Sequence, residues 1–347
     1  MTFVRSLNTG FSRAGRTKRL IVLAWLASLF LGLALALPLL RELDRYISPT
    51  FVEEKLAERY DENAVETMKA DREGSVLLGS LDPTMFGFAT FLGVYDQYLN
   101  GAGVKWVGDF LYNLVFRFRV LPGSAILMMM LLLLYGLLWN YLAGGFIGIY
   151  AKDPSGTITD FLKYGGKYFG RLFRLSLVAV ILYALLFVFV FDNIRLAIAS
   201  GTANDASEMT PFIYYVVKNA AVLLLLGVLA MCFDYAKVRI VVEDRASAFG
   251  ALARGAGFAL KHFASTASLY LLLAVIGALL IAVLTLVDRW IPQSSYWTVL
   301  LVFLLQQLYM AGRFWLKATT YAAETDLFQR LSESPAAIVP PTATVST

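Results

Sequence analysis

The chain of 347 residues is 59% hydrophobic and only 16% charged, with a formal net charge of +5 at pH 7. This composition excludes an ordinary soluble domain and indicates a membrane protein. Nucleic acid is excluded as a partner, because the basic residues lie beside apolar runs and form no stripe interleaved with aromatics. One cysteine, Cys232, and one histidine, His262, give too little material for a disulfide, a multi-histidine metal site or a histidine relay. We therefore expect no metal site and no cofactor.

The amino-terminal end combines positive charge with a first apolar run. Residues 1–19 carry five Lys or Arg and no acid, and we expect a basic cytoplasmic segment there. The run at 20–40 resembles a secretory signal, but it is long enough to cross ~30 Å of hydrocarbon, whereas the apolar core of a signal has about 7–15 residues. We predict a retained first span, with cleavage near Ala36 as the alternative.

Residues 41–123 are the one large region outside the predicted spans, and we expect a small helical extracytoplasmic cap. Two short apolar helices are predicted at 84–99 and 104–118, but at ~15 residues each, and with Asp96 and Asp109, neither is long or apolar enough to be a span. Their many aromatic residues suit a hairpin that lies in the membrane interface or roofs the bundle. The alternative is a compact cap packed on its own aromatics.

Five further apolar runs predict the second to sixth spans, within a bundle covering residues 124–331. They lie at 125–150, 172–191, 212–233, 267–287 and 297–314. The last run continues as a helix to Leu331, and the Pro-, Ser- and Thr-rich tail at 332–347 is predicted to be disordered. The predicted fold class is all-α: a polytopic membrane bundle of six transmembrane helices with a small helical cap.

Positive charge alternates along the predicted connections. Residues 1–19, 151–174 and 234–266 carry five Lys or Arg each, whereas 192–211 and 288–296 carry one each. Because Lys and Arg are retained on the cytoplasmic side, both termini are predicted to be cytoplasmic and the cap to lie outside. The expected location is the bacterial inner membrane.

The cytoplasmic connectors at 151–171 and 234–266 are predicted to contain amphipathic helices. The helix before 234 is expected to run on through Arg239, and a new helix to begin near Asp244 or Ser247, either of which can cap it. Phe249, Leu260 and Phe263 fall on one side of that helix. It would lie in the membrane surface, contacting lipid or a protein partner. Packing against neighbouring helices is the alternative.

Basic side chains gather at the predicted inner interface and are candidate contacts for anionic lipid headgroups if several converge on one groove. They are Lys167, Arg171, Arg174, Arg239, Arg254, Lys261, Arg313 and Lys317. Asp234 lies at the inner edge of the fourth run, and we expect it to form a helix-orienting salt bridge with Arg239 or with the basic connector before the third span.

Polar residues inside apolar runs are the other candidates, because they are costly at bilayer depth. They are Asn140, Lys218, Asn219, Gln306 and Gln307. The amides are expected to form interhelical hydrogen bonds, with a substrate path as the alternative. Lys218 either serves an anionic substrate or extends to the outer headgroups.

Glycines at spacings of three and four, in 144–148 and 165–170, allow helices to approach closely. We expect packing within the chain, with a homo-oligomer interface as the alternative.

Two segments resemble cytoplasmic connectors of poorly characterised six-span bacterial membrane proteins. They are residues 163–175 (KYGGKYFGRLFRL) and 234–252 (DYAKVRIVVEDRASAFGAL). The resemblance implies an inner-membrane protein and no particular activity. A weaker likeness, carried by Glu243, Ala246, Ala248 and Gly250, is to permease subunits of ATP-driven (ABC-type) transporters.

The sequence has no HExxH, GxSxG or P-loop motif, and we expect no catalytic centre. The predicted function is a transport (permease-like) or envelope and lipid-handling membrane component. One alternative is an enzyme on lipid-linked or anionic headgroup substrates that uses Asp234 or Glu243. Another is a self-associating structural protein.

Overall fold

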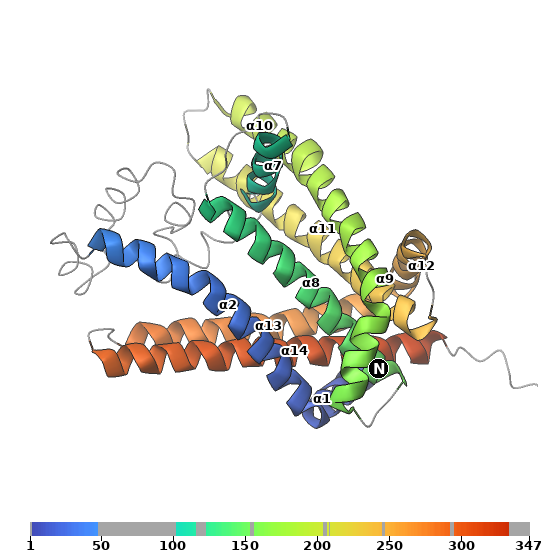
Figure 1. Ribbon diagram of the computed structural model, residues 1–347. Coiled ribbons are helices and arrows are strands. Elements are labelled where there is room, and N and C mark those ends of the chain that lie inside the picture. Colours follow the sequence, from blue (N-terminus) through green and yellow to red (C-terminus); the bar gives the residue numbers. More distant parts are fainter. Residues whose placement is uncertain are drawn as a thin grey trace, which may run out of the picture.

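The computed structural model describes residues 2–47, 102–115, 123–152, 156–203, 207, 209–244, 247–291 and 295–332. Every regular element among these residues is a helix (Figure 1). The predicted helix at 84–99, most of the predicted cap and the tail at 333–347 lie outside the described residues.

The helices follow the predicted apolar runs. The chain begins with α1 (Thr2–Arg16) and α2 (Lys18–Ile47), and α7 (Ala102–Val115) precedes the main bundle. The bundle consists of α8 (Gly123–Lys152), α9 (Ile158–Leu185), the π-helical η2 (Leu186–Phe191), α10 (Asp192–Gly201), α11 (Met209–Val242), α12 (Ala248–Lys261), α13 (Phe263–Trp290) and α14 (Tyr296–Ser332). All five apolar runs predicted after residue 124 lie within helices, so the all-α class is confirmed.

Among the described residues, five helices are long and apolar enough to cross a membrane: 126–152, 158–201, 209–242, 263–287 and 296–332. A sixth results if the pair α1 and α2, bent by 74° at residue 17, is taken as one broken span. The third predicted span is part of a longer helix, because α9, η2 and α10 continue from Ile158 to Gly201 without interruption.

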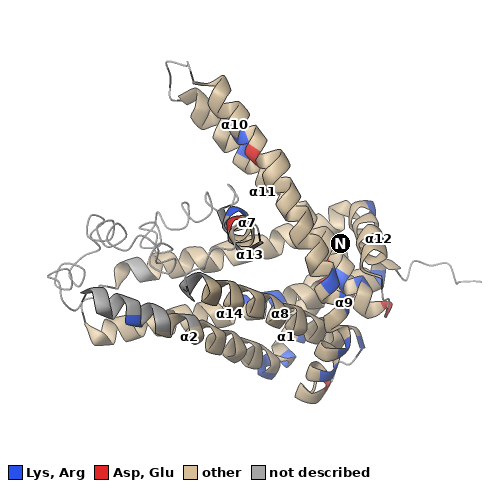
Figure 2. Ribbon diagram, turned by 45° about the horizontal axis from the view of Figure 1, so that its top comes forward, with Lys and Arg blue, Asp and Glu red and all other residues tan. Residues whose placement is uncertain are grey.

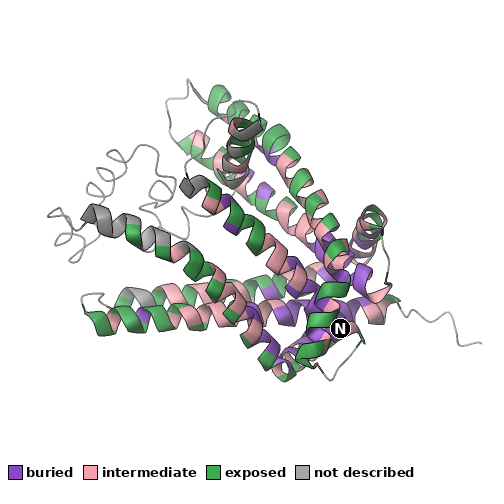
Figure 3. Ribbon diagram, viewed as in Figure 1, coloured by how far each residue is buried: buried purple, intermediate pink, exposed green. Residues whose placement is uncertain are grey.

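The helices converge at one end of the molecule, which we call the packed end. It comprises α1, the start of α2, the last turns of α8, the first half of α9, the carboxy-terminal halves of α11 and α14, and α12 (Figure 1). Buried residues are concentrated there, whereas the other halves of the long helices are mostly exposed and apolar (Figure 3). Lys and Arg gather at the same end (Figure 2). Exposed apolar helix faces of this kind suit contact with lipid.

The amino-terminal segment is a structured part of the packed end. One face of α1, formed by Ser6, Leu7, Gly10 and Ala14, is buried. A side chain at Gly10 would lie 2.8 Å from the Cβ of Ala323 and 2.9 Å from the oxygen of Thr319, so α1 lies directly on α14. The carboxy-terminal half of α14 is consequently covered, with Ala318 to Phe328 almost entirely buried.

The short helix α7 lies at the opposite end of the bundle from α12 (Figure 1). Its Lys105 forms an ion pair of 2.9 Å with Asp192 at the start of α10. This is the described part of the predicted 104–118 helix.

Glycines join α8 to α9 in the way expected for packing within the chain. A Cβ at Gly145 would lie 2.6 Å from the ring of Phe161, and one at Gly148 would lie 2.5 Å from Tyr164. From the other side, a Cβ at Gly165 would lie 2.8 Å from Cε1 of Tyr141 and 3.0 Å from the backbone oxygen of Tyr141. Close approach of the two helices therefore requires glycine at these positions.

Gly165→Ala should lower the stability of the protein by about 1–3 kcal/mol, because the Tyr141 backbone cannot move aside. At the adjacent Gly166, a Cβ would have no other atom within 4 Å, so G166A is the matched control. It should be neutral or stabilise by up to about 1 kcal/mol, the helix-propensity gain of Ala over Gly. Thermal unfolding in detergent measures both, and equal behaviour of the two variants would contradict the close packing.

Candidate functional site

Helix α11 carries an aspartate into the packed end. Between Pro211 and Asp234 the helix rises about 35 Å at ~1.5 Å per residue, slightly more than the ~30 Å of a hydrocarbon core. Between Trp297 and Lys317, α14 rises about 30 Å on the same arithmetic. The two residues therefore reach the same depth, at the boundary where the apolar parts of the helices end.

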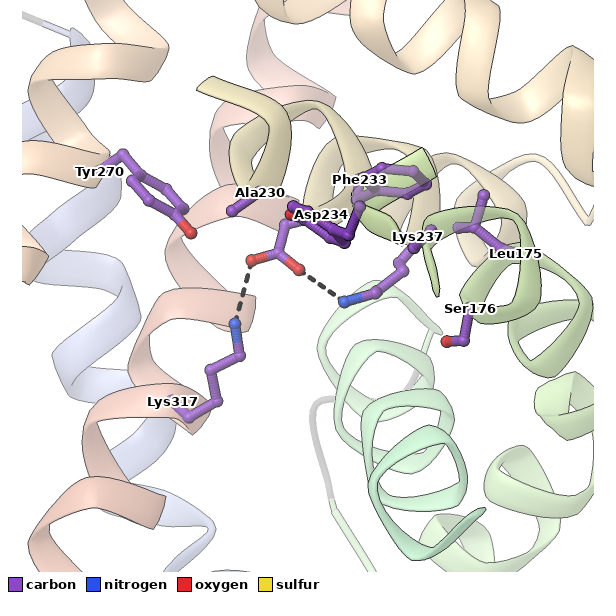
Figure 4. A pocket seen from close by; sticks show the side chains of 10 residues that line it. Leu175, Ser176, Ala230, Phe233, Asp234, Lys237, Tyr270 and Lys317 are labelled. Carbon is purple, nitrogen blue, oxygen red and sulfur yellow. Dashed lines mark hydrogen bonds and ion pairs between the residues drawn. The ribbon is translucent and has the colours of Figure 1, made fainter. Parts of the chain in front are cut away.

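Asp234 binds two lysines from different helices. Its carboxylate accepts a hydrogen bond of 2.7 Å from Nζ of Lys237, one turn further along α11, and one of 3.0 Å from Nζ of Lys317 on α14. Figure 4 shows the carboxylate between the two amino groups, with the hydroxyl of Tyr270 pointing toward the same space. The Asp234 side chain is only 5% exposed, whereas Lys237 is 17% and Lys317 27% exposed.

The expected pairing of Asp234 with Arg239 or with the connector before the third span is wrong. At about 100° per residue, a position five residues ahead lies well round the helix, whereas a position three ahead lies on the same face. Arg239 pairs instead with Glu243, four residues ahead, at 2.7 Å. Lys317, which was predicted as a contact for anionic lipid headgroups, is therefore an ion-pair partner of Asp234.

A cavity of about 230 Å³ adjoins this ion pair, and we call it the Asp234 cavity. Its lining residues come from α9, α11, α13 and α14: Leu175, Ser176, Ala179, Tyr183, Ala230, Phe233, Asp234, Lys237, Tyr270 and Lys317. The hydroxyl of Ser176 donates a hydrogen bond of 2.6 Å to Asn140 of α8, so the predicted polar residue Asn140 fixes one wall of the cavity. The interior offers both apolar and polar groups.

The charges of the cavity are unequal in number. Two ammonium groups face one carboxylate, and each ammonium has three N–H donors, of which Asp234 takes one. Lys317 also lies 4.7 Å from the ring centroid of Tyr321. The residues that line the cavity therefore carry an excess of positive charge and spare donors, which suits an anion such as a phosphate or carboxylate group.

A second cluster of charges lies at the surface of the packed end, and we call it the Tyr168 cluster: Tyr168, Lys152, Lys167, Arg171 and Asp244. Lys167 donates to Asp244 at 2.7 Å, Arg171 binds its other oxygen, and Lys152 lies 3.9 Å away. All three cations lie 5.1–5.7 Å from the Tyr168 ring centroid. The predicted contacts Lys167 and Arg171 are brought together here, with Asp244 as their partner.

The remaining predicted basic contacts do not converge on one groove. Arg174 donates to the oxygen of Gly170, Arg254 to the oxygen of Gly250, and Arg239 to the oxygen of Arg254. Arg313 lies 5.8 Å from the ring centroid of Tyr309, and Lys261 is exposed at the end of α12.

The predicted intramembrane polar residues are also dispersed. Trp25 of α2 donates a hydrogen bond of 3.3 Å to Gln307 of α14, which is the expected interhelical bond, and Gln306 is exposed. Lys218 is buried beside the ring of Tyr215, with Asn219 next to it, about 24 Å along α11 from Asp234 at ~1.5 Å per residue.

The connector helix α12 begins at Ala248 and is capped by Ser247, one of the two predicted caps, whose side chain accepts a hydrogen bond from the backbone N–H of Gly250. It buries its small residues, and a Cβ at Gly255 would lie 2.7 Å from the backbone of Ala236 on α11. Phe249, Leu260 and Phe263 are 47–72% exposed. One face of α12 therefore packs on the bundle, as the alternative interpretation expected, and the apolar stripe of the other face is exposed.

Sequence reasoning missed Lys237, Ser176, Tyr183, Tyr270 and the buried Glu324 of α14. The spacing of three between Asp234 and Lys237 was the available signal. Glu324 follows Lys317 by seven residues, two helical turns, and so lies on the same face of α14. Among the described residues, no group of three or more His, Cys, Asp or Glu side chains could hold a metal ion.

Asp244 gives a pH-dependent contribution to stability. The hydrogen bonds from Lys167 and then Arg171 lower the pKa of Asp244 from its usual 3.8 to about 2. Because the folded-state pKa lies below the unfolded one, the stabilisation is present above pH ~4 and is lost as the pH falls toward 2. The side chain is 42% exposed, so screening limits the effect to at most about 1 kcal/mol.

We therefore expect D244N to be slightly less stable than wild type at pH 7, and the difference to shrink progressively as the pH falls from about 4 toward 2. D109N, at an exposed aspartate of α7, is the control and should show a difference that does not follow this profile. Thermal unfolding in detergent across this pH range measures both. A D244N difference that is as large at pH 2 as at pH 7 would contradict the role of the ion pairs.

No protein-family model, curated protein or solved structure matches this chain.

Proposed function

We propose that this chain is a multi-pass membrane protein that binds an anionic group in the Asp234 cavity, as a component of transport or lipid handling. The ligand class is a phosphodiester or carboxylate, carried either by a membrane lipid or by a small soluble anion. The observation that carries the proposal is the sharing of one buried aspartate by two lysines on the wall of a cavity.

The size of the cavity supports a headgroup or a small anion. Its volume of about 230 Å³ lies below the ~300–1,000 Å³ of pockets that enclose drug-sized ligands. A phosphate or carboxylate group would fit, whereas the acyl chains of a lipid would stay outside. The depth of Asp234 and Lys317 along their helices corresponds to the headgroup boundary of one leaflet.

The six-span topology belongs to the same proposal. It takes α1 with α2 as the entry to the first span, both termini as cytoplasmic, and the predicted cap as extracytoplasmic, in a bacterial inner membrane. Support comes from the gathering of Lys and Arg at the packed end (Figure 2), which is expected on the cytoplasmic side. The Asp234 cavity would then open near the inner leaflet.

The two alternatives have weaker support. An enzyme would need a carboxylate available to the substrate, but both oxygens of Asp234 accept hydrogen bonds from lysines and Glu243 pairs with Arg239. Self-association through the glycines of α8 would compete with their present contacts, because Gly144, Gly145 and Gly148 already pack on α9.

Anion binding can be measured by titrating the purified protein in a neutral detergent, with isothermal calorimetry as the readout. The probes are dihexanoylphosphatidylglycerol (an anionic lipid headgroup), dihexanoylphosphatidylcholine (its zwitterionic counterpart) and dimethyl phosphate (a free phosphodiester). We expect K317Q and K237Q each to weaken binding of the anionic probe about tenfold or more, the value of one charged hydrogen bond. K163Q, which replaces an exposed lysine on α9, is the matched control and should bind the anionic probe like wild type.

The three probes distinguish the possible sources of the anion. Binding of the phosphatidylglycerol probe alone identifies a lipid headgroup, and binding of dimethyl phosphate with the same dependence on Lys317 identifies a soluble anion. Binding that is equal for the anionic and zwitterionic probes, or unchanged in K317Q and K237Q, would overturn the proposal.

A further inference from the structure

Glu324 is a buried acid that has no hydrogen-bonding partner in the part of the chain that the structure describes. It lies in the covered half of α14 and is 1% exposed. Among the described residues, neither carboxyl oxygen has a hydrogen-bond partner, and the same holds for the hydroxyls of Tyr235 and Tyr321. A buried carboxyl group normally has partners, so this side chain needs a physical explanation.

The charges around Glu324 are those of the Asp234 cavity. It interacts electrostatically with Asp234 and Lys237 of α11 and with Lys317 of its own helix. Glu324 also interacts electrostatically with three tyrosines: Tyr235 of α11, Tyr270 of α13 and Tyr321 of α14. Arg13 of α1 also faces α14, but its ion-pair partner there is Asp326, at 3.8 Å. Arg330 binds Asp326 as well.

The net charge of the buried set formed by Asp234, Lys237, Lys317 and Glu324 depends on one proton. With Glu324 ionised, two carboxylates balance two lysines. With Glu324 protonated, the set carries one positive charge. An ionised carboxylate that receives no hydrogen bond is costly in a buried position, so its charge is supported here mainly by the two lysines. Anything that neutralises those lysines removes that support.

We propose that Glu324 is a proton-binding site coupled to the Asp234 cavity, so that the cavity takes up an anion together with one proton. The inference rests on the proposed function. An anion on Lys237 and Lys317 places a further negative charge near Glu324, and Glu324 then takes a proton from the solvent, which keeps the buried set at the same total charge. By reciprocity, protonation of Glu324 strengthens anion binding by the same factor.

This coupling gives the cavity a function beyond binding. A protein that takes up an anion and a proton together can release both together when the site opens to a different environment. The chemical class is therefore an anion–proton pair, with the proton held on a carboxyl group two turns from Lys317 and the anion on the lysines.

The test counts protons during anion binding. Wild-type protein is titrated with dihexanoylphosphatidylglycerol and, separately, with dimethyl phosphate, because neither phosphodiester titrates near neutral pH. Calorimetry in buffers of different ionisation enthalpy then gives the number of protons taken up. We expect proton uptake approaching one per anion in wild type over part of the pH range, and none in E324Q. E324Q should also bind the anion about tenfold more tightly than wild type at the alkaline end.

E243Q is the matched control, the same chemical change at a glutamate paired with Arg239, and should keep the wild-type proton uptake. Anion binding to wild type without proton uptake at any pH overturns this inference and leaves the proposed function intact. Proton uptake that persists in E324Q also overturns it. If neither probe binds wild type, the proposed function fails and the inference fails with it. The absence of proton uptake in wild type overturns the inference even if E324Q does not fold.

Discussion

The structure depends on one buried carboxylate that holds two lysines. Asp234 is 5% exposed and accepts hydrogen bonds from its own helix, at Lys237, and from α14, at Lys317. Removing one member of a buried ion pair leaves the other charged and unpartnered, at a typical cost of about 3–5 kcal/mol. The rotations of α11 and α14 about their axes are therefore fixed relative to each other at this point.

The packed end is built around that constraint. Small residues allow close contact on both sides of it: Gly255 of α12 lies against Ala236 of α11, and Gly10 of α1 lies against Ala323 of α14. Glu324 is buried in the same packed end, two turns along α14 from Lys317. The opposite halves of the helices remain apolar and exposed, as lipid-facing surfaces are. A charged cavity thus forms where apolar helices enter a compact, basic region, and this position suits an anion at the membrane boundary.

The helices and their shared basic end could be predicted from the sequence, because apolar runs and Lys/Arg counts are local signals. The signal for the N-cap at Ser247 was also local, because the capping residue directly precedes its own helix. The pair Asp234 and Lys317 could not be predicted, since it joins residues 83 positions apart and depends on helix rotation. Glu324 was missed for a related reason. It follows the last apolar run in a stretch of mixed composition, and its burial depends on how other helices pack on the carboxy-terminal half of α14, which no local pattern predicts.

The most direct measurement is a double-mutant cycle of D234N and K317Q, read as unfolding free energy in detergent. Our account predicts that D234N is the more damaging single change, because it leaves two lysines without their carboxylate. It also predicts that the double variant loses less than the sum of the singles, by about 0.5–3 kcal/mol. Strictly additive losses would contradict the claim that Asp234 and Lys317 hold α11 and α14 together.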